Sequence, residues 1–342
     1  MMSTKLRFAI VGAGVISSFH ARAVTENPEA ELVAISDVSE EKAQKLAEEY
    51  SIPSIHTDYH EMLQRQDIDV VCICVPSGMH TEVAVAAAQA GKHILCEKPL
   101  DTTIAKMDLM IHEAREAQVK LGVIYQRRTF PAAIAARKAV QENRLGKLVL
   151  GDAYLKYYRS QEYYDSAGWR GTWELDGGGA LMNQGVHGVD LIQWIVGDVE
   201  SVFARSAALV RNIEVEDTAV AVVKYVNGAY GVIQGTTSVW PGQETRFEIH
   251  GEKGSIVFAD SGIKQWEFMD GEPSVPDVAG TASASNDASN ISADGHYILI
   301  DDMIQAIKED RDPMVTGEDA SKAVKLILAI YESARTGLEV RL

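Results

Sequence analysis

Five short apolar runs in the first 125 residues constrain the fold more strongly than any other feature of this chain. They are rich in Val, Ile, Leu and Cys and lack polar alternation, which is typical of strands covered on both faces of a parallel sheet. The runs lie at residues 7–11, 32–36, 70–75, 93–96 and 122–125. Helical stretches are predicted at residues 39–50, 82–90 and 104–118. Right-handed crossovers between such elements give an open, doubly wound sheet, so we predict an α/β domain over residues 1–126.

The pattern changes after about residue 147, where hairpin signals such as Asn227-Gly228 separate the apolar runs. Strands are predicted at residues 148–158, 201–211, 218–226, 229–239, 245–250, 255–260 and 263–268. Helices are predicted at residues 180–196, 298–308 and 319–334. Residues 272–295 are rich in Ser, Ala, Asp, Asn and Pro and predict a long loop. We therefore expect a second α/β domain, residues 127–342, with a large, mainly antiparallel open sheet.

A glycine turn follows the first predicted strand and opens a helix. Residues 12–17, Gly-Ala-Gly-Val-Ile-Ser, match G-x-G-x-x-G with Ser in the third glycine position. The first glycine allows the tight turn, and the second lets the backbone approach a pyrophosphate at the helix N-terminus. The predicted dinucleotide contacts in this turn are Gly12, Gly14, Val15 and Ile16.

An acidic residue ends the next predicted strand and bears on the choice of dinucleotide. Asp37 lies 23 residues beyond Gly14. A carboxylate at this place bonds the ribose 2′-hydroxyl of NAD and repels the 2′-phosphate of NADP. We therefore predict NAD, although the neighbouring Ser36 is compatible with a phosphate.

Two further motifs follow predicted strands, at the carboxyl ends where open α/β sheets bind ligands. One is residues 75–80, Val-Pro-Ser-Gly-Met-His, and the other is residues 97–100, Glu-Lys-Pro-Leu. A lysine placed directly after a buried strand and before a stiffening proline is unlike an ordinary solvated surface lysine. The cofactor contacts predicted from these motifs are Pro76, Ser77, His80, Glu97 and Lys98.

The predicted helix 180–196 carries the remaining polar motif. Asn183 and His187 are four residues apart and so lie on one helical face, and Asp190 is placed to orient the imidazole. Residues 177–179 are three glycines, which permit close approach of a ligand or of backbone. A helix with a satisfied interior histidine would show the same pattern.

Taken together, these motifs resemble the glucose–fructose oxidoreductase, inositol dehydrogenase and rhizopine-catabolism family, written Gfo/Idh/MocA. The resemblance covers essentially the whole chain and includes the glycine turn, Glu97-Lys98-Pro99, residues 126–128 with Pro131, the glycine-rich helix and the closing segment 330–334, Ile-Tyr-Glu-Ser-Ala. It implies a Rossmann domain joined to an α/β domain whose open sheet often mediates dimers or tetramers.

The resemblance also implies residue roles. Lys98 stands at the place of the active-site lysine near the nicotinamide, and His187 at the place of the catalytic histidine. Asn183 stands where many inositol-dehydrogenase-like members carry aspartate, so a Lys–Asp–His relay reduces here to Lys98 and His187. Members with this Asn-Gln-Gly-X-His variant resemble sugar or nucleotide-sugar dehydrogenases that act at a ring hydroxyl, commonly the 3-position.

The chemistry of alcohol oxidation fits these residues independently. A hydroxyl proton must leave as hydride leaves the same carbon, and neutral imidazole is a suitable base near pH 7. A cation beside the oxygen stabilises the developing alkoxide. We therefore interpret His187 as the general base, Lys98 as its electrostatic partner and Asn183 as a contact to a substrate hydroxyl.

Substrate contacts are also predicted in the polar aromatic stretch 157–173. Aromatic faces with hydrogen-bonding tips suit a carbohydrate, and arginine suits a carboxylate or phosphate. The further predicted contacts are Arg127, Tyr158 and Arg170. A packed loop or a subunit contact would explain the same composition.

Composition excludes other classes. With 32 basic and 49 acidic residues, a net charge of −17 argues against binding nucleic acid or anionic lipid. Three cysteines indicate a reducing, cytoplasmic setting, and no set of residues has metal-ligand spacing. The prediction is an NAD-dependent dehydrogenase of a sugar, polyol or nucleotide sugar that self-associates. A glycoside-cleaving enzyme that recycles its NAD and a cofactor-dependent sensor remain open.

Overall fold

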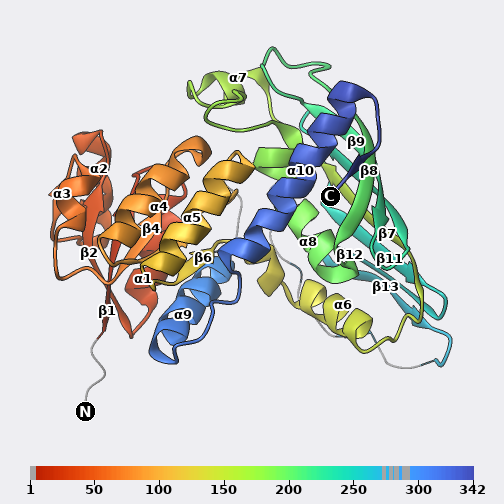
Figure 1. The fold of residues 1–342 in the computed structure, drawn as a ribbon, viewed down its shortest axis with the longest axis horizontal. Coiled ribbons are helices and arrows are strands. Elements are labelled where there is room, and N and C mark those ends of the chain that lie inside the picture. The colour runs from red at the N-terminus through yellow and green to blue at the C-terminus, as the bar shows by residue number, and fades with distance from the viewer. Residues whose placement is uncertain (1–4, 272–274, 277–279, 281–284, 287–292) are drawn as a thin grey trace. The chain divides into compact units, whose positions relative to one another are not determined.

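The computed structural model describes residues 5–271, 275–276, 280, 285–286 and 293–342. The chain divides into two compact units, one formed by residues 1–126 with 293–321 and the other by 127–292 with 322–342 (Figure 1). The predicted boundary after residue 126 is also a boundary of the structure. The prediction assigned residues 293–321 to the second domain, whereas the structure packs them with the first.

Side-chain contacts account for this difference. Asn27 donates a hydrogen bond to Asp301, and Glu29 accepts one from Gln305. These partners are far apart in the sequence, and helical periodicity shows only that a face is buried, not which unit buries it.

The first unit is built on a six-stranded sheet of order β3-β2-β1-β4-β5-β6 in which every pair is parallel. Its strands are β1 (Leu6–Val11), β2 (Ala30–Ser36), β3 (Ile55–His56), β4 (Val70–Ile73), β5 (His93–Cys96) and β6 (Leu121–Val123). Its helices are α1 (Ser17–Glu26), α2 (Glu40–Tyr50), α3 (Tyr59–Leu63), α4 (His80–Gln89), α5 (Ile104–Glu116) and α9 (Asp294–Lys308). The order reverses between β1 and β4, which is the switch point where doubly wound sheets bind ligands. The predicted doubly wound fold is confirmed.

The second unit is built on an eight-stranded sheet of order β13-β12-β11-β7-β10-β9-β8-β14. Its strands are β7 (Leu148–Lys156), β8 (Val199–Ala207), β9 (Thr218–Tyr225), β10 (Tyr230–Thr236), β11 (Arg246–Gly251), β12 (Gly254–Ala259), β13 (Gly262–Phe268) and β14 (Val340–Arg341). All described pairs are antiparallel except β7 with β10, which is parallel. The predicted mainly antiparallel sheet is confirmed.

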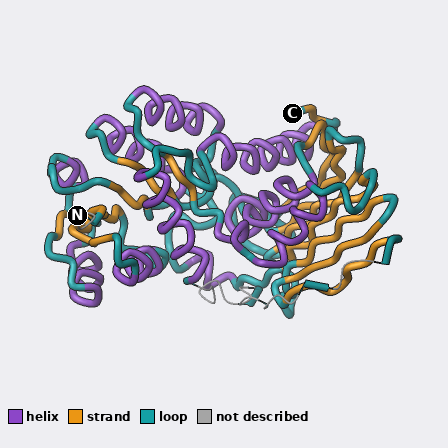
Figure 2. The backbone as a smooth tube through the Cα atoms, turned by 90° about the horizontal axis from the view of Figure 1, so that it is seen from below, coloured by secondary structure: helices purple, strands orange, loops and turns teal. Residues whose placement is uncertain are grey.

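Helices of the second unit gather on one face of this sheet (Figure 2). They are α6 (Pro131–Gln141), α8 (Val186–Val196) and the later part of α10 (Gly317–Thr336), and the unit also contains the short helix α7 (Gln161–Asp165). Gly188 of α8 lies so close to β7 that an added Cβ would be 2.3 Å from the side chain of Leu155. Strand β9 alternates between buried Ala221 and exposed Val220 and Val222, so the opposite face presents apolar side chains.

The predicted loop 272–295 falls mostly outside the described residues, and its last two residues, Asp294 and Gly295, belong to α9. Among the described helices, none combines the length and apolar character needed to cross a bilayer.

Candidate active site

The glycine turn of the first unit has the shape that a dinucleotide requires. Gly12 has φ +100°, and an added Cβ would lie 2.6 Å from the carbonyl oxygen of Cys74, so no larger residue fits. Gly14 has nothing within 4 Å of that position, which leaves the backbone open for close approach. Helix α1 begins at Ser17, and its N-terminal N–H groups and dipole favour an anion. These residues fit a pyrophosphate.

Asp37 lies at the end of β2 and is bound to the same turn. Its carboxylate accepts hydrogen bonds from the backbone N–H of Ala13 at 2.6 Å and of Ser39 at 2.8 Å. The structure therefore brings the predicted ribose-binding acid beside the predicted pyrophosphate turn, as NAD binding requires.

His80 lies between the two strand-end loops that carry the predicted cofactor contacts. Its Nε2 is 3.0 Å from the carbonyl oxygen of Val75, and its Nδ1 is 2.9 Å from that of Pro99. The ring is buried, and both nitrogens lie against backbone carbonyls. We therefore revise the prediction that His80 contacts the cofactor and assign it the role of joining the two loops. Pro76 and Ser77 lie in the loop that it holds, at the start of the short helix η1 (Ser77–Met79).

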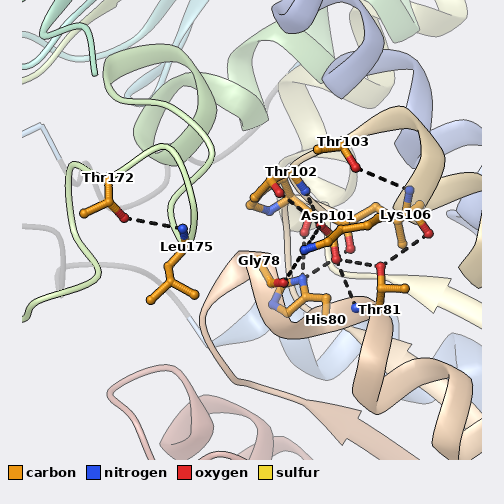
Figure 3. A network of polar contacts seen from close by, with 11 residues as sticks. Gly78, His80, Thr81, Asp101, Thr102, Thr103, Lys106, Thr172 and Leu175 are labelled. Atoms are coloured by element: carbon orange, nitrogen blue, oxygen red, sulfur yellow. Dashed lines mark hydrogen bonds and ion pairs between the residues drawn. The ribbon is translucent and has the colours of Figure 1, made fainter. Parts of the chain in front are cut away.

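A buried carboxylate strengthens this junction (Figure 3). Asp101 accepts hydrogen bonds from the backbone N–H and the hydroxyl of Thr81 at 3.0 and 2.6 Å. It also accepts the backbone N–H of Thr102, and Lys106 Nζ lies 3.6 Å from it. Lys106 in turn donates to the carbonyl of Gly78 at 2.6 Å. The loop before α4 and the loop after β5 are thus fixed by one network.

Glu97 is buried at the end of β5 and does not have the exposed position expected of a cofactor contact. Its Oε1 lies 2.8 Å from His20 Nε2 on α1 and 3.3 Å from His296 Nε2 on α9. Burial alone would raise the pKa of Glu97, but the hydrogen bonds with His20 and His296 hold it well below its usual range. We therefore revise its predicted role to one of supporting the loop that carries Lys98.

The same three side chains have ligand atoms within 4.8 Å of one another, which is a metal-like grouping that the sequence did not predict. His20 and His296 are separated from Glu97 by 77 and 199 residues, so no local spacing reveals the group. The direct hydrogen bonds already satisfy the carboxylate, and we assign no metal to it.

Lys98 follows Glu97 and precedes a cis Lys98–Pro99 peptide bond. Its backbone N–H donates to Glu97 Oε2 at 3.3 Å. The side chain is half-buried, which agrees with the sequence-based view that this lysine is unlike a solvated surface lysine. The backbone that carries it is therefore tied to α1 and α9 through Glu97.

The predicted helix 180–196 consists of two parts in the second unit. Residues Ala180–Gly185 form a π-helical turn, η3, and α8 continues from Val186. Such turns occur often at functional sites. Asn183 Nδ2 donates to Asp176 Oδ1 at 2.6 Å, and Gln184 Nε2 donates to Asn183 Oδ1 at 3.1 Å. The orientation of the Asn183 amide is thus defined by a buried carboxylate one hydrogen bond away.

His187 lies on the first turn of α8 and is buried. Asp190, predicted to orient its imidazole, accepts two hydrogen bonds from Arg128, at 2.6 and 2.9 Å. Both members of this ion pair are buried, and the bidentate geometry makes it a strong structural contact. Asp190 therefore joins α8 to the segment that precedes α6.

The three remaining predicted substrate contacts have different surroundings. Arg127 is buried and donates to Thr245 at 2.5 Å and to Asp260 at 3.1 Å, so we withdraw it from the substrate contacts. The guanidinium of Arg170 lies 4.0 Å from the ring centroid of Tyr163. Tyr158 packs edge-on against Trp240 at 4.8 Å. The latter two remain candidates.

Sequence reasoning missed two buried acids beside the helix that carries His187. Asp176 supports Asn183, and its other oxygen accepts the N–H of Gly171. Glu216 accepts hydrogen bonds from the backbone N–H of Gly179 and Leu181 at 2.9 Å each. Asp176 immediately precedes the three glycines, which was a usable signal, whereas nothing in the sequence around Glu216 points to this helix.

Comparisons with known proteins agree with this geometry. Residues 6–125 match the oxidoreductase family with an NAD-binding Rossmann fold, and residues 133–257 match the GFO/IDH/MocA C-terminal domain. Myo-inositol 2-dehydrogenase of Thermotoga maritima is 29% identical over 345 residues, 98% of each chain. The 1,5-anhydro-D-fructose reductase of Ensifer adhaerens is 28% identical over 335 residues, 97% of each chain. The crystal structure of the WlbA dehydrogenase from Bordetella pertussis in complex with NADH and UDP-GlcNAcA is 36% identical, with a TM-score of 0.89 and 99% of each chain covered.

Proposed function

This chain belongs to the GFO/IDH/MocA family of oxidoreductases, and on that premise we propose that it is an NAD-dependent dehydrogenase. Its proposed substrate is an anionic, nucleotide-linked sugar, and the enzyme oxidises the ring hydroxyl at position 3 of that sugar. The first unit is an NAD-binding Rossmann domain. The relatives named above act on several sugars and polyols, so the family alone leaves the substrate open.

Two arginines of the second unit, Arg170 and Arg211, are the reason for proposing an anionic substrate. The guanidinium of Arg170 lies over Tyr163 at 4.0 Å, and that of Arg211 lies over Tyr158 at 5.2 Å. Within the described parts of the chain, neither forms a salt bridge, although acidic residues outnumber basic ones by 49 to 32. Arginine binds phosphate and carboxylate groups through its planar fork, and a neutral polyol offers neither group.

The similarity to the WlbA dehydrogenase supports the same choice. That protein was crystallised with UDP-GlcNAcA, which carries a diphosphate and a sugar carboxylate. It is 36% identical to this chain, compared with 29% for the inositol dehydrogenase of Thermotoga maritima.

Each proposed catalytic residue has one task in removing hydrogen from the C3 carbinol. His187 takes the hydroxyl proton as general base, and the ammonium of Lys98 stabilises negative charge that develops on the oxygen. Asn183 holds a neighbouring substrate hydroxyl through the amide that Asp176 orients. NAD, when bound, supplies the hydride acceptor. The carbinol carbon becomes a ketone as it loses a proton from oxygen and a hydride from carbon.

Nicotinamide absorbance tests this proposal. The purified protein is incubated with NAD or NADP and with UDP-GlcNAcA, UDP-GlcNAc, myo-inositol or levoglucosan. We expect NADH with the UDP-linked sugar acid at a kcat/KM at least tenfold above that for the neutral polyols, and NMR of the product places the carbonyl. Replacement of His187 by Ala should reduce kcat by about 10² to 10⁴.

The matched control is His250→Ala, which removes a histidine bonded to Ser255 on the far hairpin of the same unit. It should leave kcat unchanged. Wild-type turnover by His187→Ala would refute the base assignment, and preference for myo-inositol would refute the anionic substrate.

Self-association is also proposed, through the exposed apolar face of the second sheet. Phe203 pairs with Val222 across β8 and β9, and both are exposed. Light scattering should show an assembly that Val222→Lys dissociates, and a monomeric wild-type protein would contradict it.

A further inference from the structure

One residue binds the start of the helical segment that carries Asn183 and His187. The first turns of a helix leave backbone N–H groups without helical partners, and Ser, Thr, Asp or Asn usually satisfies them from the N-cap position. Here the N-cap is Gly179, which has no side chain. Glu216, from a segment 37 residues away, satisfies the same groups instead.

Glu216 binds three consecutive positions. Its carboxylate accepts the N–H of Gly179 and of Leu181 at 2.9 Å each, and its backbone carbonyl accepts the N–H of Ala180 at 3.0 Å. Asn183 follows within the same turn, because its N–H donates to the carbonyl of Gly179 at 3.0 Å. A movement of Gly179 at the start of η3 therefore also moves Asn183.

Tyr331 completes the arrangement from α10. Its hydroxyl donates to Glu216 Oε1 at 2.8 Å, and its ring packs edge-on against Trp173 with centroids 5.4 Å apart. The tyrosine belongs to the closing segment 330–334, for which the proposed chemistry gives no role.

The glycines show how closely these parts approach. An added Cβ on Gly179 would be 1.8 Å from the carbonyl oxygen of Glu216, and one on Gly178 would be 2.3 Å from the hydroxyl of Tyr331. These two residues are glycine because Glu216 and Tyr331 occupy the space of a side chain.

From this geometry we propose that Glu216 and Tyr331 are positioning residues, and that turnover requires the deprotonated carboxylate of Glu216 to hold the start of the segment bearing Asn183 and His187. The inference rests on the proposed function of those two residues. Glu216 is buried, and in this proposal it acts through the backbone of the helix.

The electrostatic setting makes the arrangement sensitive to pH near neutrality. Burial raises the pKa of Glu216 to about 7, although the N–H groups of Leu181 and Gly179 and the hydroxyl of Tyr331 favour the charged form. Tyr164 of α7 also interacts electrostatically with Glu216, and its own pKa is raised to about 12, chiefly by burial. Across the described chain, no lysine or arginine forms an ion pair with Glu216.

The pH dependence of kcat tests the proposal with Tyr331→Phe, which removes one hydroxyl and keeps the ring. Loss of this hydrogen bond raises the pKa of Glu216 further, since Tyr331 lowers it. The acidic limb of kcat should therefore move to higher pH, by about 0.5 to 1 pH unit, while KM for NAD stays unchanged. The matched control is Tyr225→Phe, which removes a buried hydroxyl bonded to the carbonyl of Gly151 at 2.9 Å.

Amide hydrogen exchange provides a readout that does not need turnover. Peptides that cover residues 177–186 should lose protection, after correction for intrinsic exchange rates, as the pH falls through about 7. The sign holds for a local opening that frees the helix start while Glu216 stays buried, because the charged carboxylate then loses the N–H groups of Gly179 and Leu181 that lower its pKa. In Tyr331→Phe this loss should begin at higher pH. If the exchange behaves so but the protein turns over no substrate, the proposed function fails and the helix anchor stands.

Three results would overturn the inference. One is an unchanged acidic limb and unchanged exchange in Tyr331→Phe. Another is an equal shift in Tyr225→Phe, which would mean that any lost hydroxyl has this effect. The third is full wild-type kcat from pH 6 to pH 9 in Glu216→Gln, because glutamine cannot deprotonate.

Discussion

Replacing Glu216 by Gln should change the way in which the stability of the second unit depends on pH. The carboxyl has an ordinary pKa of 4.5, and burial raises it to about 7 in the folded protein. Between these values the folded state binds a proton that the unfolded state does not. The free energy of unfolding therefore falls as the pH rises from 4.5 to about 7. The stabilisation of the folded state by Glu216 is fully present below pH 4.5 and is lost above about pH 7.

The magnitude follows from the two pKa values. A difference of one pH unit corresponds to about 1.4 kcal/mol, so the whole displacement corresponds to about 3 kcal/mol. About 2.5 kcal/mol of this lies between pH 5 and pH 8.5. Glutamine does not titrate, so the unfolding free energy of the wild type minus that of Glu216→Gln should fall by about this amount across the range.

Tryptophan fluorescence during urea unfolding measures this difference in the second unit alone. All five tryptophans lie in that unit, at Trp169, Trp173, Trp194, Trp240 and Trp266. The control is Glu267→Gln, an exposed acid on β13, whose curve should stay parallel to that of the wild type. A difference that stays constant from pH 5 to pH 8.5, or that grows with pH, would refute the reasoning.

Three other substitutions have expected outcomes. Asp37→Asn should raise the ratio of kcat/KM with NADP to that with NAD by about tenfold or more, because it removes the charge that repels a 2′-phosphate. Asp176→Asn should lower kcat/KM by about 10- to 100-fold in the nicotinamide assay, because Asn183 loses a charge-assisted hydrogen bond of 2.6 Å. Gly179→Ala should lower the urea stability of the second unit by at least about 3 kcal/mol, because its Cβ would meet the carbonyl oxygen of Glu216.

Each of these has an outcome that contradicts it. An unchanged cofactor ratio in Asp37→Asn would mean that the carboxylate only ties the turn to Ala13. Unchanged kinetics in Asp176→Asn would show that Asn183 does not need the carboxylate of Asp176 for its role in turnover. Gly168→Ala is the control for the glycine change, since no atom lies within 4 Å of its added Cβ, and equal losses in both variants would refute the steric argument.

Most of the first unit was predictable because its signals are local, although β3 and α3 were not predicted and α9 was assigned to the second domain. Strands buried on both faces need unbroken apolar runs, and the glycine turn needs its residues at fixed spacing. Asp37 ends a strand adjacent to the turn, so position along the chain was enough to place it. Helix α6 was missed although it carried a signal, Pro131 at its first turn followed by a run of alanines.

The polar partners were not predictable in the same way. Asp190 was predicted to orient His187 because it lies three residues further along the helix. No local pattern showed that Arg128, from another segment, donates to both of its carboxylate oxygens. Glu97 and His80 lie at the expected strand ends, and their side chains point to buried partners rather than to open space. Periodicity determines which face a residue occupies, and the partner across that face depends on packing between distant segments.

The glycines link these two levels. Gly12 and Gly179 are the same kind of observation in the sequence, a glycine before a helix, and in both the added Cβ would strike a carbonyl oxygen, of Cys74 at 2.6 Å and of Glu216 at 1.8 Å. A glycine at such a position indicates that another backbone segment lies against it, but it does not show which segment that is. At Gly12 the partner is the end of the neighbouring strand, which sheet topology supplies. At Gly179 the partner is an irregular segment before β9, so only the structure reveals that the helix bearing His187 is anchored by a carboxylate poised to titrate near neutral pH.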